Sequence, residues 1–125
     1  MPINLILKSE ALAVMGAGTA IWVVNDGSLL LLVPALLLPD LSMVGYLAGP
    51  RLGALTYNAA HNWTIGLIVL GIGWWLAVAG VLLAGAILLA HVGMDRALGY
   101  GLKLPSGFQD THLGRIGREG GRMRP

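Results

Sequence analysis

Five polar side chains interrupt the long apolar stretches of this sequence, and they are the residues best able to do chemistry: Asp40, Asn58, His61, His91 and Asp95. His91 and Asp95 are four residues apart, and Asn58 and His61 are three apart, so each pair would share one face of a helix. A charged side chain at membrane depth costs about 2.5–3.5 kcal/mol. Because that cost falls when such groups satisfy one another or a ligand, we expect the five side chains to converge.

Two imidazoles and two carboxylates form a mixed nitrogen and oxygen donor set that suits zinc, manganese or iron. The sequence therefore predicts a divalent metal site with Asp40, His61, His91 and Asp95 as ligands and Asn58 in a supporting position. Two other interpretations stay open. In one, the polar groups only join the helices through hydrogen bonds. In the other, His61 and His91 are the axial ligands of a tetrapyrrole, an arrangement that gives the carboxylates no role.

A further carboxylate and imidazole follow near the C-terminal end, in the stretch Gln-Asp-Thr-His at residues 109–112. If this stretch folds over the inner helix ends, Asp110 or His112 would act as general base or acid. The simpler alternative is an Asx turn in a solvated tail. No nucleophile elbow, Walker, Rossmann, EF-hand or HExxH pattern is present, and the absence of cysteine excludes disulfides and thiolate ligands.

The composition places these residues in a membrane. Hydrophobic residues make up 56% of the 125-residue chain and charged residues only 11%, whereas charged residues make up about 25% of a typical soluble domain. We therefore expect the lipid bilayer as the main partner. The net charge of +2 does not indicate nucleic acid, because a few bases beside apolar stretches more often set membrane orientation.

A transmembrane helix needs about 20 mostly apolar residues, and the sequence divides into four such segments, at residues 5–24, 28–47, 52–70 and 75–98. Residues 52–94 contain no Asp, Glu, Lys or Arg and are long enough for about two crossings. We place the reversal within them at residues 71–74. The expected fold class is all-α, an integral membrane bundle of four transmembrane helices over residues 1–100, followed by a cytoplasmic, basic, glycine-rich tail over residues 101–125.

Every basic residue falls on one side of this four-helix topology. The eight are Lys8, Arg51, Arg96, Lys103, Arg115, Arg118, Arg122 and Arg124. The other side carries Asp26 alone. Because cytoplasmic flanks hold the excess of Lys and Arg, both termini are expected in the cytoplasm.

Two stretches of the chain, PDLSMVGYLAGPRLGALTYNAAH at residues 39–61 and HVGMDRALGYGLKLPSGFQDTHLGRIG at residues 91–117, resemble a small bacterial integral membrane family catalogued as domain of unknown function 4260. The resemblance spans nearly the whole chain. It implies a four-helix protein of the bacterial inner membrane that carries the polar positions named above, Asp110 and His112 included. It implies no activity. Pro39-Asp40-Leu41 also resembles the Pro-Asp-Leu-Asp motif of membrane-bound metal-dependent hydrolases, with Ser42 in place of the second aspartate.

Two functions of different class follow from these observations, and the sequence leaves open whether the protein is an enzyme. A metal held near the cytoplasmic face would lower the pKa of bound water and hydrolyse an ester or phosphoester in a lipid-like substrate. Alternatively, the chain is a non-catalytic accessory subunit of a larger membrane complex, or it self-associates. In that case the polar cluster fixes helix register, and faces of small residues dock the partner.

Overall fold

The computed structural model describes residues 2–116. The end of the predicted tail, with Arg118, Arg122 and Arg124, lies outside the described residues. Within the described part the order of helices is α1 (Ile3–Val24), α2 (Leu29–Leu37), the 3-10 helix η1 (Leu38–Ala48), α3 (Pro50–Ala60), α4 (Trp63–Trp75) and α5 (Ala79–Leu98). Two short strands follow, β1 (Asp110–Thr111) and β2 (Gly114–Arg115). The expected all-helical membrane-type architecture is therefore confirmed at this level.

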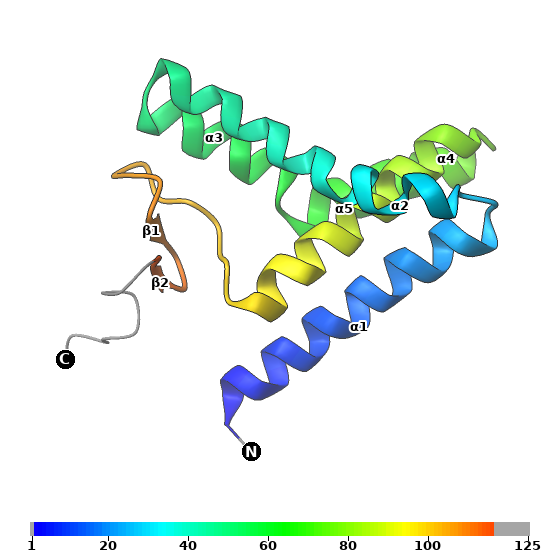
Figure 1. Ribbon diagram of the computed structural model, residues 1–125, viewed down its shortest axis with the longest axis horizontal. Helices are drawn as coiled ribbons and strands as arrows, with labels where there is room; N and C mark the ends of the chain where they lie inside the picture. The colour runs from blue at the N-terminus through cyan, green and yellow to red at the C-terminus, as the bar shows by residue number, and fades with distance from the viewer. Residues whose placement is uncertain (1, 117–125) are drawn as a thin grey trace.

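Figure 1 shows that the chain runs back and forth between two ends of the molecule. The α1–α2 and α4–α5 turns lie at the right of the view. The start of α1, the end of α5, the connection between η1 and α3 and the two strands lie at the left. Helices α1 and α5 run side by side, α4 packs on α5, and η1 packs along α3. Helix α5 is thus the central element of the fold.

Three apolar stretches among the described residues are long enough to cross a membrane. They are Ile3–Val24, Leu29–Ala48 and Ala79–Leu98. Helix α4 has 13 residues, a length of about 20 Å at 1.5 Å per residue, which is shorter than the hydrocarbon core of about 30 Å. The second stretch changes from α to 3-10 geometry at Leu38, next to Pro39. The chain therefore has membrane-type helices.

The predicted third helix, residues 52–70, is wrong in its continuity, because the chain breaks between α3 and α4. His61 ends α3, and Asn62 begins α4 as its N-cap, accepting a 2.9 Å hydrogen bond from the backbone N–H of Ile65. The Asn62 amide also donates to the carbonyl of Asn58 at 2.7 Å. A broken helix exposes backbone groups that need partners. Here the side chain of Asn62 bonds one such group at the end of α3 and another at the start of α4.

The reversal lies at Leu76–Val78 instead of the expected residues 71–74. Ala77 takes a positive φ of 54° there, while Gly71 and Gly73 lie inside α4. Gly73 is needed for packing, since a Cβ at this position would overlap the backbone of Leu82 on α5. In membrane helices small residues permit close backbone approach. This glycine therefore marks a helix contact and not a turn.

A close backbone contact at a glycine also joins α1 to α5. A Cβ on Gly18 would lie 2.5 Å from the carbonyl oxygen of Ala86 and 2.8 Å from the amide nitrogen of Ala90. Both alanines are fully buried. The two backbones therefore touch through small residues, which supplies the packing that replaces a hydrophobic driving force in lipid.

The described part of the predicted tail is folded. Helix α5 ends at Gly99, which has a φ of 93°, and the N–H of Tyr100 bonds back to the carbonyl of Asp95, a helix-terminating pattern typical of glycine. Strands β1 and β2 then pair antiparallel, and Thr111 also pairs with Lys103. This hairpin, with residues 99–109, is called the C-terminal extension below, and it packs beside the site.

Candidate metal centre

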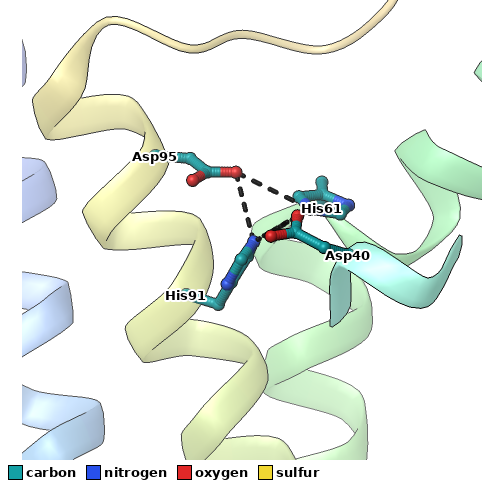
Figure 2. Close-up of side chains that lie close together, drawn as sticks. All are labelled: Asp40, His61, His91 and Asp95. Carbon is teal, nitrogen blue, oxygen red and sulfur yellow. Dashed lines mark hydrogen bonds and ion pairs between the residues drawn. The ribbon is translucent and has the colours of Figure 1, made fainter. Parts of the chain in front are cut away.

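Three separate elements supply the cluster of two histidines and two aspartates. Asp40 lies in the first turn of η1, His61 caps the end of α3, and His91 and Asp95 share one face of α5. Figure 2 shows the four side chains pointing toward one another. One donor atom from each lies within 4.8 Å of all the others. The structure thus brings together the four residues that the sequence singled out as ligands.

The donor atoms are spaced like the corners of a small polyhedron. The Nε2 atoms of His61 and His91 are 3.0 Å apart. The Oδ1 atom of Asp40 is 3.2 and 3.1 Å from them, and the Oδ2 atom of Asp95 is 3.6 and 3.3 Å from them. A tetrahedral site with ligands at about 2.0–2.1 Å from the ion has ligand separations of about 3.3–3.4 Å. These five distances lie close to the edges of a first-row metal site, and the sixth, between the two carboxylate oxygens, is within 4.8 Å.

Backbone carbonyls fix the tautomer of both rings. His61 Nδ1 lies 2.7 Å from the carbonyl oxygen of Tyr57, and His91 Nδ1 contacts the carbonyl oxygen of Leu36. A carbonyl only accepts hydrogen bonds, so both Nδ1 atoms must carry the proton. In a neutral imidazole this leaves the lone pair on Nε2, which is the atom that faces the cluster. This arrangement is typical of metal-binding histidines, whose second nitrogen donates to an outer acceptor.

Interruptions of the helical backbone favour these two bonds. In the 3-10 pattern the carbonyl of Leu36 would pair with the N–H of residue 39, but Pro39 has none. The N–H of His61 turns to the carbonyl of Asn58 at 3.3 Å instead of continuing the α-helical pattern to Tyr57. The His61 ring then bonds the Tyr57 carbonyl. Broken backbone geometry is therefore part of how the site is built.

The cluster is buried on one side and open on the other. His91 is 0% exposed and His61 3%, whereas the side chains of Asp95 and Asp40 are 14% and 36% exposed. The Tyr57 ring stacks on His61 with centroids 3.7 Å apart, and its hydroxyl lies 3.4 Å from Asp95 Oδ2. Access to the cluster is thus through the carboxylates and not through the rings.

A cavity of about 310 Å³ adjoins this open side. It is lined by two residues of the cluster, by Tyr57 and Met43, and by residues that follow α5. The lining residues are Asp40, Met43, Tyr57, Asp95, Tyr100, Lys103, Phe108 and Ile116. A volume of this size lies at the lower end of small-molecule sites. A small polar group therefore fits beside the carboxylates.

Arg96 lies next to Asp95 in sequence, but its side chain bonds a backbone carbonyl. Its guanidinium donates to the carbonyl of His61 at 3.2 Å and lies 6.0 Å from the ring of Trp63. This bond satisfies a carbonyl exposed by the break between α3 and α4. It also ties the end of α5 to the loop that carries His61.

Asn58 was expected to support the cluster from within the helices, and the structure gives it a different contact. Its side-chain amide donates to the carbonyl of Lys103 at 2.8 Å and accepts from the N–H of Lys103 at 2.6 Å. This paired bond attaches the C-terminal extension to α3. Asn58 therefore positions the wall of the cavity.

Asp110 and His112 are not brought into the cluster. Asp110 accepts a 2.7 Å bond from Ser106, and His112 Nδ1 accepts a 2.8 Å bond from the N–H of Leu102. Neither residue lines the cavity. Both side chains hold the turns of the C-terminal extension in this structure. Their role as general base or acid stays a prediction.

Lys103 is the residue of the site that sequence reasoning missed. It is buried, and its ammonium lies over the rings of Phe108 and Tyr57 at 3.9 and 5.0 Å from their centroids. Burial lowers the pKa of Lys103, while the nearby charges of Asp95 and Asp40 act in the opposite direction. In the sequence it is one base among several in a polar stretch, so no local signal distinguishes it.

Comparison with known proteins places the chain in one family. The model of the family described as Domain of unknown function (DUF4260) matches residues 4–116. No curated protein and no solved structure matches the chain. The match covers the five α-helices and η1, apart from the first residue of α1, and it includes the four clustered residues. The chain therefore belongs to the DUF4260 family.

Proposed function

We propose that this protein is a membrane-embedded metal protein in which Asp40, His61, His91 and Asp95 hold one divalent transition metal, zinc, manganese or iron. The observation that carries the proposal is the convergence of two imidazole lone pairs and two carboxylate oxygens on one point. Such a set of acceptors needs a cation at its centre.

Charge balance requires two positive charges in this cluster, because it holds two carboxylates and a net negative charge is costly in a membrane. The 3.0 Å gap between the two Nε2 atoms has room for one proton and not for two. A second proton would have to lie between a ring and a carboxylate, as between His91 and Asp95 at 3.3 Å. A divalent ion with two neutral rings and two carboxylates gives zero net charge with a single group, and it uses all four donors at once.

The geometry also favours an ion over a tetrapyrrole. Axial histidines approach a macrocycle from opposite faces, and the plane between them belongs to the ring. Here both carboxylate oxygens lie within 3.6 Å of the two nitrogens, in the space that the macrocycle would need. The carboxylates act as ligands in the proposed site instead of as obstacles.

The open cavity supports hydrolysis as the function of the metal. A bound divalent ion would lower the pKa of water and polarise an ester or phosphoester bond of a lipid-like substrate. Water would add across that bond, its hydroxyl joining the acyl or phosphoryl group and its proton leaving with the alcohol. The chain contributes a buried, helix-borne donor set, and the cavity beside Asp40 and Asp95 would admit the bond to be cleaved.

The proposed topology has four crossings, with both termini in the cytoplasm and the third crossing made by α3 and α4 together. Lys8 lies near the start of α1, Arg51 at the start of α3, Arg96 near the end of α5 and Lys103 in the C-terminal extension, and Figure 1 shows these parts of the chain toward the left of the view. A bacterial inner membrane would orient this basic end toward the cytoplasm. The cluster then lies in the inner half of the bilayer.

Metal content tests the proposal. The full chain, purified in a maltoside detergent without chelators, should contain about one equivalent of a transition metal by mass spectrometry, and His91→Ala should contain less than about 0.1 equivalent, because loss of a buried ligand removes the site. The control is His112→Ala, which lies outside the cluster and should keep the metal. A wild-type protein without metal that also fails to take up zinc, manganese or iron would refute the proposal.

A non-catalytic accessory subunit is the second candidate, and the number of ligands favours it. Four protein donors complete a tetrahedron, as in structural zinc sites, whereas catalytic sites keep one position open. The partner would be another membrane subunit or a second copy of this chain. Visible spectra of the cobalt-substituted protein separate the two functions. Addition of acetohydroxamate should change the cobalt spectrum of an open site and leave that of a closed site unchanged.

A further inference from the structure

Lys103 carries a buried positive charge that the metal centre does not use. The residue is 4% exposed, and its ammonium contacts the ring faces of Phe108 and Tyr57. Within residues 2–116 the ammonium itself makes no hydrogen bond or ion pair. A ring face attracts an ammonium group more weakly than an anionic hydrogen-bond acceptor does. A buried charge without an anionic partner is costly. Binding of an anionic hydrogen-bond acceptor would therefore stabilise this ammonium.

The position of Lys103 is set by its backbone and not by its charge. Asn58 bonds both the N–H and the carbonyl of Lys103, and Thr111 pairs with its other edge. Such a residue is held from both sides as in a strand. The stem of the side chain can therefore present the ammonium to the cavity with little loss of conformational freedom.

This cation and two of the proposed metal ligands share one cavity. Asp40, Asp95 and Lys103 all line the cavity of about 310 Å³, with Met43 and Phe108 among the apolar lining. One small charged group fits in it, while a long acyl chain does not fit at this volume. The expected ligand is therefore a compact anionic group that bridges the metal and Lys103.

Charge counting selects the class of anion. The proposed centre is neutral when a divalent ion is bound by two carboxylates and two neutral imidazoles, so Lys103 leaves the site with a charge of +1. We propose that the cavity binds a phosphodiester monoanion, with one phosphoryl oxygen on the Lys103 ammonium. This inference rests on the proposed metal centre and narrows its substrate from esters in general to phosphodiesters. A neutral carboxylic ester would leave the lysine without a partner.

The test uses the full-length chain in maltoside, loaded with Mn²⁺, and the paramagnetic relaxation of ³¹P in diethyl phosphate. Lys103→Met should weaken diethyl phosphate binding about ten- to hundredfold, the range for loss of one charge-assisted hydrogen bond. Lys103→Arg should stay within a few fold of wild type. Lys8→Met, a matched loss of one lysine outside the cavity, should leave the affinity unchanged.

Two further probes separate the possible sources of the anion. Triethyl phosphate has a similar shape without charge, and its binding should not respond to Lys103→Met. Dihexanoyl phosphatidylglycerol carries the same diester on a lipid. If it binds at least tenfold more tightly than diethyl phosphate and also depends on Lys103, the natural ligand is a lipid headgroup. If the two bind alike, it is a soluble diester.

The outcomes distinguish this inference from the metal centre. Bound Mn²⁺ with equal diethyl phosphate affinities in wild type and Lys103→Met would overturn the phosphodiester site alone. Failure of the wild-type protein to bind Mn²⁺ or any other of the proposed metals would overturn the metal centre and this inference with it. Loss of Mn²⁺ in Lys103→Met would contradict the assignment of Lys103 to the ligand, because the lysine would then act on the metal.

Discussion

The α1–α5 pair and the region around the candidate metal centre differ in how an apolar helical structure satisfies its backbone hydrogen bonds. Helices α1 and α5 run without interruption, satisfy their own backbone bonds and approach each other through Gly18, Ala86 and Ala90. The centre is built where the backbone is interrupted, at Pro39 and at the break after His61. Continuous helices give close packing, whereas interrupted ones provide carbonyls that can orient side chains.

The comparison predicts that an added methyl group disrupts the α1–α5 pair more than any single change at the interruptions destabilises the fold. Gly18→Ala should lower the apparent free energy of unfolding by about 1–3 kcal/mol, because its Cβ would overlap the α5 backbone. Gly16→Ala is the matched control on the same helix, with no atom within 4 Å of its Cβ, and should be neutral or stabilising by up to about 1 kcal/mol. Thermal unfolding followed by circular dichroism measures both.

Equal melting temperatures for the two glycine variants would show that α1 and α5 are not in backbone contact. Metal content serves as a second readout. Gly18→Ala should keep its metal at temperatures below unfolding, since none of the four ligands lies on α1.

A subtler change tests whether the interruption at Pro39 orients a ligand. Pro39→Ala restores an N–H that can compete with His91 for the Leu36 carbonyl. We expect metal affinity to fall about ten- to hundredfold, the usual effect of losing an outer partner of a histidine ligand. Competition with a chelator of known affinity measures the dissociation constant of the metal in each variant.

Pro34→Ala is the control for this experiment. It also adds an N–H within the same stretch, but Pro34 lies inside α2, away from the carbonyl that His91 contacts. Metal affinity should stay the same. Equal losses in both proline variants would mean that the stretch formed by α2 and η1 acts through its overall shape and not through the Leu36 carbonyl.

Asn58→Ala should release the C-terminal extension from α3 while leaving the ligands in place. Loss of two hydrogen bonds at a half-buried position is expected to cost about 1–2 kcal/mol of local stability. Hydrogen exchange of residues 101–111 should become faster, and that of α1 should not change. Retention of slow exchange in this segment would show that strand pairing alone holds the extension.

The smallest effect concerns pH. Burial, with a further contribution from Arg96, lowers the pKa of His112, and neutral Nδ1 accepts the Leu102 N–H. Because the folded pKa lies below the unfolded value of about 6.5, the stabilisation is complete above that value and is lost as pH falls through the folded pKa. The hydrogen-exchange protection factor at Leu102, which corrects for the intrinsic pH dependence of exchange, should therefore fall as the pH drops below the unfolded pKa of about 6.5. His112→Asn, which keeps an acceptor and does not titrate, should remove this dependence.

Part of the site could be predicted because it depends on local periodicity. His91 and Asp95 face the same way on any helix, and an acid or imidazole in an apolar stretch indicates a cluster. The reversal was expected too early, at residues 71–74, because the glycines at 71 and 73 resemble turn residues, although Gly73 is packed against Leu82. The break after His61 was a separate omission. The Asn62 N-cap was the available signal for the break.

The sequence by itself determined that this chain forms membrane-type helices and that a few acids and imidazoles lie among them, since both follow from composition and helical period. Only the tertiary structure decided that three elements bring the carboxylate oxygens within 3.1–3.6 Å of the Nε2 atoms, and that Lys103 lines the same cavity as Asp40 and Asp95. The physical reason is that these distances depend on where broken backbones turn and which carbonyls they leave accessible. Those features arise from contacts between residues far apart in the chain.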